Sequence, residues 1–359
     1  MTEARAGLCV MGAFHMDVAV VASRIAAEGE TVIGEGPFQD PGGRGAAQAI
    51  AAARLGADVD AVGVVGDDDW GQDLRAALIG EGVNADRVTV RAGSRTGVRL
   101  VTRLPDGRSS RVVGAGANAG WGPEDVEAVR GVIAAAKVLL VQAELPTPAI
   151  ESAIAIAHGA GKKVLWHTCA AVGLAPERLA EIDVLVASLP EARAMLELES
   201  GEPCSPGGLA RRVAALGPRW VALWGTETPG HADVGGGFLF DGERVHHVSP
   251  SEHDIRDDCA SVDAFAAALA VAVSEDQRAL GALRFAVAAA GLCTVAGTVA
   301  GTVASTAAST AASTAAGAAF ARFPTRAVVE RRLAESAAAG HEKPPGALPV
   351  RPSGAAQPS

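Results

Sequence analysis

The stretch DDCASVDAFAAAL, residues 257–269, is a polar turn of small residues that runs directly into an apolar helix. Phe265 and Leu269 follow at helical spacing, so the helix is expected to begin near Ser261. The first turn of a helix presents backbone N–H groups without intrahelical partners and the positive end of the dipole. An anion can rest there while Asp263 faces the same cleft, an arrangement that suits a carboxylate base beside a phosphate. An aspartate in a first turn is also a common capping residue, and that interpretation stays open.

Composition limits the class of protein. A chain of 359 residues, 49% of them hydrophobic, allows one large α/β domain or two ordinary ones. The net charge of −10, without a cluster of Lys and Arg, argues against a nucleic-acid-binding surface. No run has the Leu, Ile, Val and Phe content of a membrane span, and the N-terminus lacks the pattern of a signal peptide. The five cysteines form neither an even disulfide set nor a CxxC pair, so a cytoplasmic location is expected.

Short apolar runs alternate with segments of helical periodicity, a pattern that predicts an α/β fold with a mainly parallel sheet. The expected strands are residues 8–12, 59–65, 138–142, 163–166, 184–186 and 220–224, with a hairpin at 237–240 and 244–248. The expected helices are residues 46–55, 70–81, 124–136, 149–160, 191–198 and 326–338. Two further strands, 96–104 and 111–113, flank the turn Pro105-Asp106-Gly107 and suit a small side sheet.

Polar residues follow several of these strands. His15 and Asp17 are two apart on an extended segment and therefore share one face. Glu144 stands just past one strand and His167 ends another, where α/β sheets place ligand groups. A glycine-rich turn, residues 42–45, precedes a helix and allows close approach of a ligand to the backbone. A solvated turn remains the alternative for the segment with His15 and Asp17, and a plain turn for the glycine-rich one.

The order of motifs resembles the ribokinase-like (PfkB) family of carbohydrate and nucleoside kinases, over about residues 8–330. The matching pieces are GAFHMD (12–17), GGRGAAQA (42–49), VGDDDWG (65–71), RTGV (95–98), GAGANA (114–119), VQAELP (141–146) and DDCASVDAF (257–265). The resemblance implies a three-layer α/β/α domain, residues 1–335, with a small β-sheet lid from about 13–40 and 95–118. Residues 336–359 are expected to form a disordered tail.

The resemblance also implies a function, the ATP-dependent phosphorylation of a hydroxyl on a small sugar or nucleoside. Asp263 matches the family's general base. The implied substrate-binding residues are Asp17, Gly42, Gly43 and Glu144, joined by the two imidazoles of His15 and His167. The implied nucleotide and phosphate contacts are Ser188, Gly225, Ala260, Ser261 and Val262, and Glu191 would organise water around Mg²⁺. A monovalent cation site and a homodimer through the lid are further implications.

Several positions depart from the family pattern. The family's G-A-G-D anion hole is Ala260, Ser261, Val262 and Asp263 here. Valine lacks the conformational freedom of glycine, so either the turn has another shape or the hole is poorly formed. The family's asparagines are also replaced, by His15, Ala47, Ser188 and His167, and its phosphate-turn Thr or Lys by Leu223.

These departures leave more than one functional interpretation. A divergent kinase is one, and a catalytically weak or inactive relative that binds a small polar metabolite is another. Repurposed chemistry in the same cleft is a third. His15, Asp17, His167 and Cys169 are candidate zinc ligands if the strand ends meet. Cys259 is expected to be a packing residue rather than a nucleophile.

Residues 294–317 repeat a tetrapeptide six times: TVAG, TVAG, TVAS, TAAS, TAAS and TAAG. A period of four drifts against the 3.6-residue helical turn, so the threonines do not form one stripe. Alanine favours a helix while threonine and glycine oppose it, which predicts a marginal helix or a mobile loop. In the family this region lies beside the adenine, so a displaced adenine pocket is the expected consequence.

Overall fold

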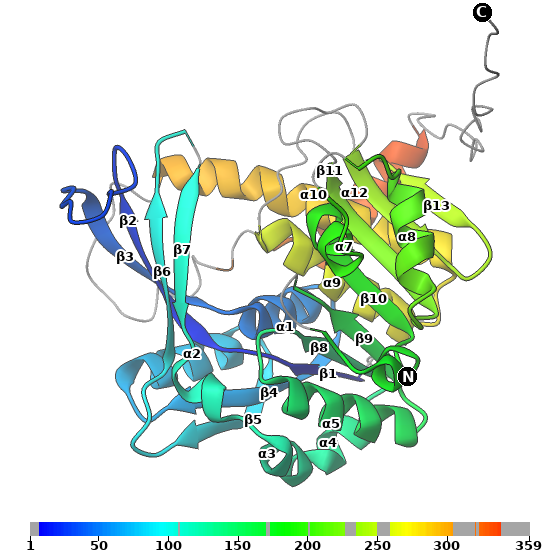
Figure 1. Cartoon of the computed structure of the whole chain (residues 1–359), viewed down its shortest axis with the longest axis horizontal. Coiled ribbons are helices and arrows are strands. Elements are labelled where there is room, and N and C mark those ends of the chain that lie inside the picture. Colours follow the sequence, from blue (N-terminus) through cyan, green and yellow to red (C-terminus); the bar gives the residue numbers. More distant parts are fainter. Residues whose placement is uncertain are drawn as a thin grey trace, which may run out of the picture.

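Two β-sheets of different size organise the chain (Figure 1). The computed structural model describes residues 7–106, 108–169, 173–199, 202–226, 235–249, 259–303, 320 and 323–338. The strands are β1 (Gly7–Met11), β2 (His15–Val21), β3 (Glu35–Gly42), β4 (Asp58–Gly66), β5 (Asn84–Arg91), β6 (Gly97–Arg103), β7 (Ser109–Gly114), β8 (Val138–Gln142), β9 (Lys163–His167), β10 (Val184–Ser188), β11 (Trp220–Thr226), β12 (Gly235–Phe240) and β13 (Val245–Val248). The helices are α1 (Arg44–Arg54), α2 (Asp69–Gly80), α3 (Pro123–Ala128), α4 (Arg130–Ala135), α5 (Thr147–Gly159), α6 (Pro176–Leu179), α7 (Leu189–Met195), α8 (Pro206–Ala214), α9 (Cys259–Ser274), α10 (Ala279–Val303) and α12 (Arg326–Ala338), with a 3₁₀ turn at Gly116–Gly120.

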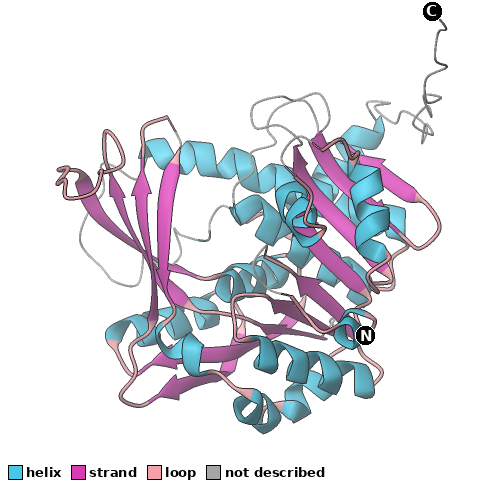
Figure 2. Cartoon of the chain, in the orientation of Figure 1, coloured by secondary structure: helices cyan, strands magenta, loops and turns pink. Residues whose placement is uncertain are grey.

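The larger sheet has the strand order β13-β12-β11-β10-β9-β8-β1-β4-β5. Its strands are parallel from β5 to β11, while β12 and β13 run antiparallel. Alternate residues of β1 enter opposite cores: Leu8 and Val10 belong to the core that contains residues of α1, α9 and α10, and Cys9 and Met11 to the core that contains residues of α3, α5 and α8. Helices therefore cover both faces (Figure 2), which confirms the predicted three-layer α/β/α fold.

The smaller sheet stands at one side of the body (Figure 1) and has the order β3-β2-β6-β7. Strands β2 and β6 pair in parallel, and the two outer pairs are antiparallel. These strands fall in the two ranges expected for a lid. One face carries the cross-strand pair Asp17 and Arg99, and the opposite face carries Val18, Leu100 and Val112.

The structure differs from the sequence prediction in a few helices and strands. The helix expected over residues 124–136 breaks at Val129, whose N–H bonds to Val126 O, three residues back, at 3.1 Å. Strand β5 and helix α8 were not predicted. The backbone of α10 is helical into the repeat as far as Val303, whereas residues 304–317 of the repeat and 339–359 of the tail lie outside the described residues. No helix within the described ranges has the length and apolar character needed to cross a bilayer.

Candidate active site

The predicted site residues gather at one edge of the central sheet. Strands β1, β8, β9 and β10 are parallel, so their carboxyl ends share this edge. His15 and Asp17 follow β1, Glu144 follows β8, His167 ends β9 and Ser188 ends β10. Open α/β sheets bind their ligands outside this edge, so its position is that of a ligand cleft.

Two glycines let the start of α1 approach the cleft. A Cβ on Gly42 would lie 2.5 Å from Asp17 Oδ1, and one on Gly43 would lie 2.4 Å from Ala13 O. Gly43 also has a φ of 95°, which is strained for any other residue. Both positions therefore require glycine, and Arg44 follows directly as the first residue of α1.

Asp263 begins the second turn of α9, directly after Val262, and is only 4% exposed. Gln48 Nε2, on α1, donates a hydrogen bond to Asp263 Oδ1 at 2.8 Å. His167 Nδ1 lies 3.9 Å from the same oxygen. A buried carboxylate needs such partners, because an unpaired one is strongly destabilising.

The departure from the family's glycine-rich anion hole does not strain the backbone. Helix α9 begins at Cys259, so Ala260, Ser261 and Val262 belong to its first turn. Of the described non-glycine residues only Glu197 and Asp276 have positive φ values. The turn therefore has a helical shape, which valine adopts readily, and it retains the N–H groups of a helix N-terminus.

The side chain of Ser261 faces the sheet. It is fully buried, and its Oγ accepts a hydrogen bond from Trp224 Nε1 at 3.2 Å. The Trp224 ring stacks on Phe265 with centroids 5.4 Å apart, which fixes α9 against β11. The next residue, Gly225, has a φ of 128°, and a Cβ there would meet no atom of the described residues within 4 Å.

Arg44 lies between two glutamates, Glu144 and Glu191. Its Nε lies 3.6 Å from Glu144 Oε1 and its Nη2 lies 3.5 Å from Glu191 Oε1. Its backbone N–H also donates to Glu144 Oε2 at 3.3 Å. The sequence prediction did not assign Arg44 a role, although it lies within the GGRG turn.

Glu191 has a second role as a helix cap. Its Oε2 accepts from the backbone N–H of Ser188 at 2.7 Å, and Ser188 Oγ accepts from the N–H of Glu191 at 3.3 Å. This reciprocal pair is a capping box at the start of α7. Ser188 and Glu191, both predicted site residues, therefore lie together at the site, and their side chains hydrogen-bond to the backbone at the start of α7.

The described residues do not form a resident metal site, because no group of three or more His, Cys, Asp or Glu side chains among them is placed to hold an ion. The zinc alternative finds no support there either, since the ring nitrogens of His167 contact Arg44 and Gln48. Mg²⁺ keeps several waters and is commonly held by one or two carboxylates together with substrate phosphates. Glu144 and Glu191, on either side of Arg44, are carboxylates of this kind.

Asp17 is buried beside two basic groups. Arg99, on β6, donates a hydrogen bond to Asp17 Oδ2, and His15 Nδ1 lies 3.2 Å from Asp17 Oδ1. This second contact has ion-pair distance without hydrogen-bond geometry, and neither ring nitrogen of His15 has a hydrogen-bond partner among the described residues. Burial raises the pKa of Asp17, but His15 and the charge of Arg99 outweigh it and hold that pKa below its ordinary value.

Two glutamines complete the interior of the site, and the sequence prediction missed both. Gln142 Nε2, at the end of β8, donates to Gln48 Oε1 at 2.8 Å, and both side chains are fully buried. A Cβ on Gly12 would lie 1.5 Å from Gln142 Oε1, so glycine at position 12 makes room for this side chain. The two glutamines lie within the quoted motifs GGRGAAQA and VQAELP, which is the only signal that pointed to them.

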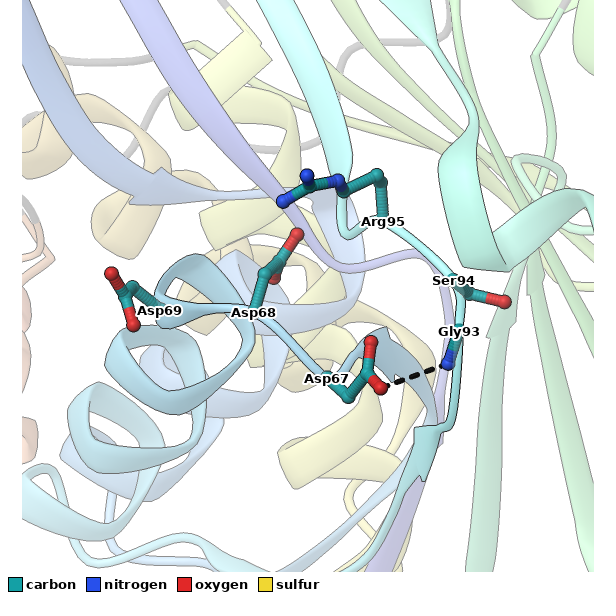
Figure 3. A pocket seen from close by; sticks show the side chains of 6 residues that line it. All are labelled: Asp67, Asp68, Asp69, Gly93, Ser94 and Arg95. Carbon is teal, nitrogen blue, oxygen red and sulfur yellow. Dashed lines mark hydrogen bonds between the residues drawn. The ribbon is translucent and has the colours of Figure 1, made fainter.

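A separate hollow of about 400 Å³ lies where the loop after β4 meets the loop before β6 (Figure 3). Asp68 caps α2 through the Gly71 N–H at 3.0 Å and accepts from the Thr96 N–H at 2.9 Å. Asp67 accepts from the Gly93 N–H at 2.8 Å. None of the predicted site residues lines this hollow, and its carboxylates hold two loops together.

Known proteins resemble this chain in both sequence and structure. The model of the pfkB family carbohydrate kinases matches residues 5–306. A ribokinase of Bacillus subtilis is 31% identical over 288 residues, which cover 79% of this chain and 92% of that protein. A ribokinase of Haemophilus influenzae is 31% identical over 195 residues, 54% of this chain, and the match spans just under two thirds (64%) of that relative.

Solved structures give the same result. The ribokinase of Arabidopsis thaliana, complexed with ribose and ATP, superposes with a TM-score of 0.72 at 26% identity, covering 92% of this chain and 99% of that one. A ribokinase of Thermotoga maritima shares the fold with a TM-score of 0.74 at 22% identity and the same coverage. With the family model matched over most of its length, the chain belongs to the pfkB family of carbohydrate kinases.

Proposed function

We propose that this protein transfers the γ-phosphoryl group of ATP to a hydroxyl of a small sugar or nucleoside, with Asp263 as general base. The acceptor oxygen forms a bond to the γ-phosphorus, and the bond from that phosphorus to the β–γ bridging oxygen breaks. The hydroxyl proton moves to Asp263, and ADP leaves with the electron pair of the broken bond. Positioning and charge stabilisation, rather than covalent catalysis, account for most of the rate in such transfers.

The position of Asp263 carries the proposal. It combines a buried carboxylate, hydrogen-bonded by Gln48 at 2.8 Å, with the first-turn N–H groups of α9 immediately before it in the chain. A base must lie within reach of the hydroxyl proton, and preorganised donors must face the developing negative charge. The start of one helix supplies both groups.

The other predicted residues take their proposed roles around this turn. His15, Asp17, Gly42, Gly43 and Glu144 would orient the acceptor, with His167 behind them. The backbone of Gly225, of residues 260–262 and of the α7 terminus at Ser188 would face the phosphates of ATP bound with Mg²⁺. The Arabidopsis relative, solved with ribose and ATP, supports a pentose as the first acceptor to test.

The test is acceptor-dependent ADP release by the full chain with ATP and Mg²⁺, measured against ribose, other pentoses, hexoses and nucleosides. ADP release with one acceptor class and its loss in Asp263→Asn are expected. ATP binding by calorimetry without turnover on any acceptor would instead favour a non-catalytic, metabolite-binding relative. The ribokinases among the relatives favour the kinase.

The outer face of the lid supports a homodimer as part of the same proposal. Val18, Leu100 and Val112 are cross-strand neighbours on one face of the small sheet. Leu100 and Val112 are 52% and 64% exposed, an unusual position for two adjacent large aliphatic side chains. A mass measurement in solution would show a dimer for the unaltered chain and a monomer for Leu100→Ser/Val112→Ser.

A further inference from the structure

The chain passes between the body and the small sheet after β1, β3, β5 and β7, and two of these crossings meet at one residue, Phe14. Phe14 lies between β1 and β2, where the chain first leaves the body. Asn118 lies in the 3₁₀ turn Gly116–Gly120, where the chain returns from β7, and it is only 2% exposed. The first and last connections of the small sheet are therefore in contact, although the two residues are 104 apart in the chain.

The Asn118 amide is fully engaged at this contact. Its Oδ1 accepts a hydrogen bond from the Phe14 N–H at 3.2 Å, and its Nδ2 donates to Phe14 O at 2.8 Å and to Ala115 O at 3.0 Å. A backbone N–H can only donate and a carbonyl oxygen can only accept, so these partners fix the orientation of the amide. The side chain therefore pairs with both backbone groups of Phe14, as a neighbouring strand would.

The ring of Phe14 is held by the body. It is fully buried in the core that contains residues of α1 and α9. A Cβ on Gly63, in β4, would lie 2.4 Å from Phe14 Cε2, so the ring fills the space beside this glycine. Phe14 is thus fixed at its side chain by the body and at its backbone by Asn118.

The proposed acceptor-binding residues follow directly. Strand β2 begins at His15, and Asp17 shares its face. Gly97 pairs with His15, and a Cβ on Gly97 would lie 2.7 Å from Asn118 Nδ2 and 3.1 Å from His15 Cβ. Asn118 therefore packs against the first residue pair of the small sheet. A change in the direction of the backbone at Phe14 would displace both acceptor-binding side chains.

We propose that Asn118 is a positioning residue for the acceptor site. It fixes the backbone of Phe14 and thereby the direction in which β2 carries His15 and Asp17. The inference rests on the proposed role of these two residues in binding the acceptor. Loss of the Asn118 amide should weaken acceptor binding and leave the chemical step at Asp263 nearly unchanged, because the groups that bind Phe14 do not touch the reacting atoms.

The first test compares two substitutions of similar size by steady-state kinetics with ATP, Mg²⁺ and ribose. Asn118→Leu removes all three hydrogen bonds. Asn118→Asp keeps an acceptor for the Phe14 N–H but turns its second oxygen toward the carbonyl oxygens of Phe14 and Ala115. We expect the KM for ribose to rise about tenfold in both variants, with kcat and the KM for ATP within about threefold of the unaltered protein.

Asp68→Ala is the matched control. Asp68 accepts from the N–H of Thr96, directly before β6, so it also secures a crossing between the body and the small sheet, but its bonds do not involve Phe14. A residue that only stabilises the fold lowers the fraction of active protein, which lowers the apparent kcat and leaves KM unchanged. That pattern in the Asn118 variants, or an equal rise of KM in Asp68→Ala, would overturn the proposal.

Hydrogen–deuterium exchange separates this inference from the proposed function, because it needs no substrate. In the full chain without ligand, we expect residues 14–19 to exchange about tenfold faster in Asn118→Leu, relative to residues 138–142 of β8, and at an unchanged rate in Asp68→Ala. Unchanged exchange of residues 14–19 in Asn118→Leu, or equal acceleration of both segments, would refute the positioning role even in an active kinase. Acceleration confined to residues 14–19, in a protein that turns over no acceptor, would support the role of Asn118 at Phe14 and refute the proposed function.

Discussion

Asp263 and Asp17 are both buried carboxylates of the cleft, but their partners differ in kind. Asp263 contacts a neutral amide and a neutral imidazole, supplied by α1 and β9 in the body of the protein. Asp17 is paired with the guanidinium of Arg99, which belongs to the same small sheet. These two contacts of Asp263 are neutral groups of the body, whereas Asp17 is paired with a charged group of the small sheet.

Under the proposed function, this difference distinguishes the residue for proton transfer, Asp263, from the residue for substrate binding, Asp17. The pKa of Asp17 lies below its ordinary value, so Asp17 stays ionised at neutral pH and is suited to accept hydrogen bonds from hydroxyl groups. Asp263 contacts the neutral groups of Gln48 and His167, which orient its carboxyl group. On this basis the body supplies the proposed chemistry, and the small sheet the proposed orientation of the substrate.

The largest effect is expected for Asp263→Asn. The amide keeps the size of the side chain but cannot take the substrate proton, so kcat should fall by about 10³-fold while the Kd for the acceptor changes little. Initial rates and calorimetry measure the two quantities. A kcat within tenfold of the unaltered protein would mean that Asp263 is not the base.

A smaller effect, mainly on KM, is expected for Asp17→Ala. It removes an acceptor for the substrate and leaves the half-buried Arg99 without this partner, so kcat/KM should fall about 10²-fold, most of it through KM. Asp17→Asn is the matched control, and its fall in kcat/KM should be smaller than that of Asp17→Ala. If Asp17→Ala lowered kcat and left KM unchanged, Asp17 would act in the chemical step as Asp263 is proposed to do, and the distinction between the two residues would be wrong.

His167 is neutral in the folded protein, because burial and then the charge of Arg44 lower its pKa well below its usual 6.5. This neutral state predicts how stability depends on pH. Below pH 6.5 the unfolded chain binds a proton at this residue and the folded protein does not, so the free energy of unfolding falls as the pH falls. The slope approaches about 1.4 kcal/mol per pH unit while the folded ring stays neutral. Urea unfolding of the unaltered protein and His167→Asn between pH 7.5 and 5.5 should show curves that diverge on acidification. Parallel curves would contradict the neutral state.

The smallest effect is expected outside the cleft, at Asp68. Asp68→Ala removes the cap of α2 and the bond to Thr96, which should lower the free energy of unfolding by about 1–2 kcal/mol. Activity should stay within about twofold, because the bonds of this carboxylate go to Gly71 and Thr96, which lie outside the predicted site. Asp67→Ala is the control. It removes one exposed hydrogen bond from Gly93, so its free energy of unfolding should fall by less than that of Asp68→Ala.

The regular core was predictable from the sequence because its strands are continuous apolar runs. Strand β5 escaped prediction because polar residues dominate it at the edge of the sheet, where burial imposes little pattern. Helix α8 escaped because its first turn is Pro206-Gly207-Gly208, a poor helix-forming sequence, although Ser205 caps it at 3.2 Å.

Resemblance to a family located the acids of the site but not their partners. Asp17, Glu144 and Asp263 were predicted, and the structure places them around one edge of the sheet. Gln48 is 94 residues from Gln142 and 215 from Asp263, and a glutamine on an alanine-rich helix carries no periodic signal. Such contacts follow from the packing of distant elements, so the sequence pattern alone did not reveal them.

The unmatched imidazole of His15 has a consequence for selectivity. Its Nε2 is buried without a hydrogen-bond partner among the described residues, so a sugar whose hydroxyl reaches this atom relieves a deficit that already exists in the protein. A deoxy analogue of the same shape leaves that deficit in place. A site of this kind discriminates against an analogue that lacks the hydroxyl group, because the buried ring nitrogen then stays without a hydrogen bond.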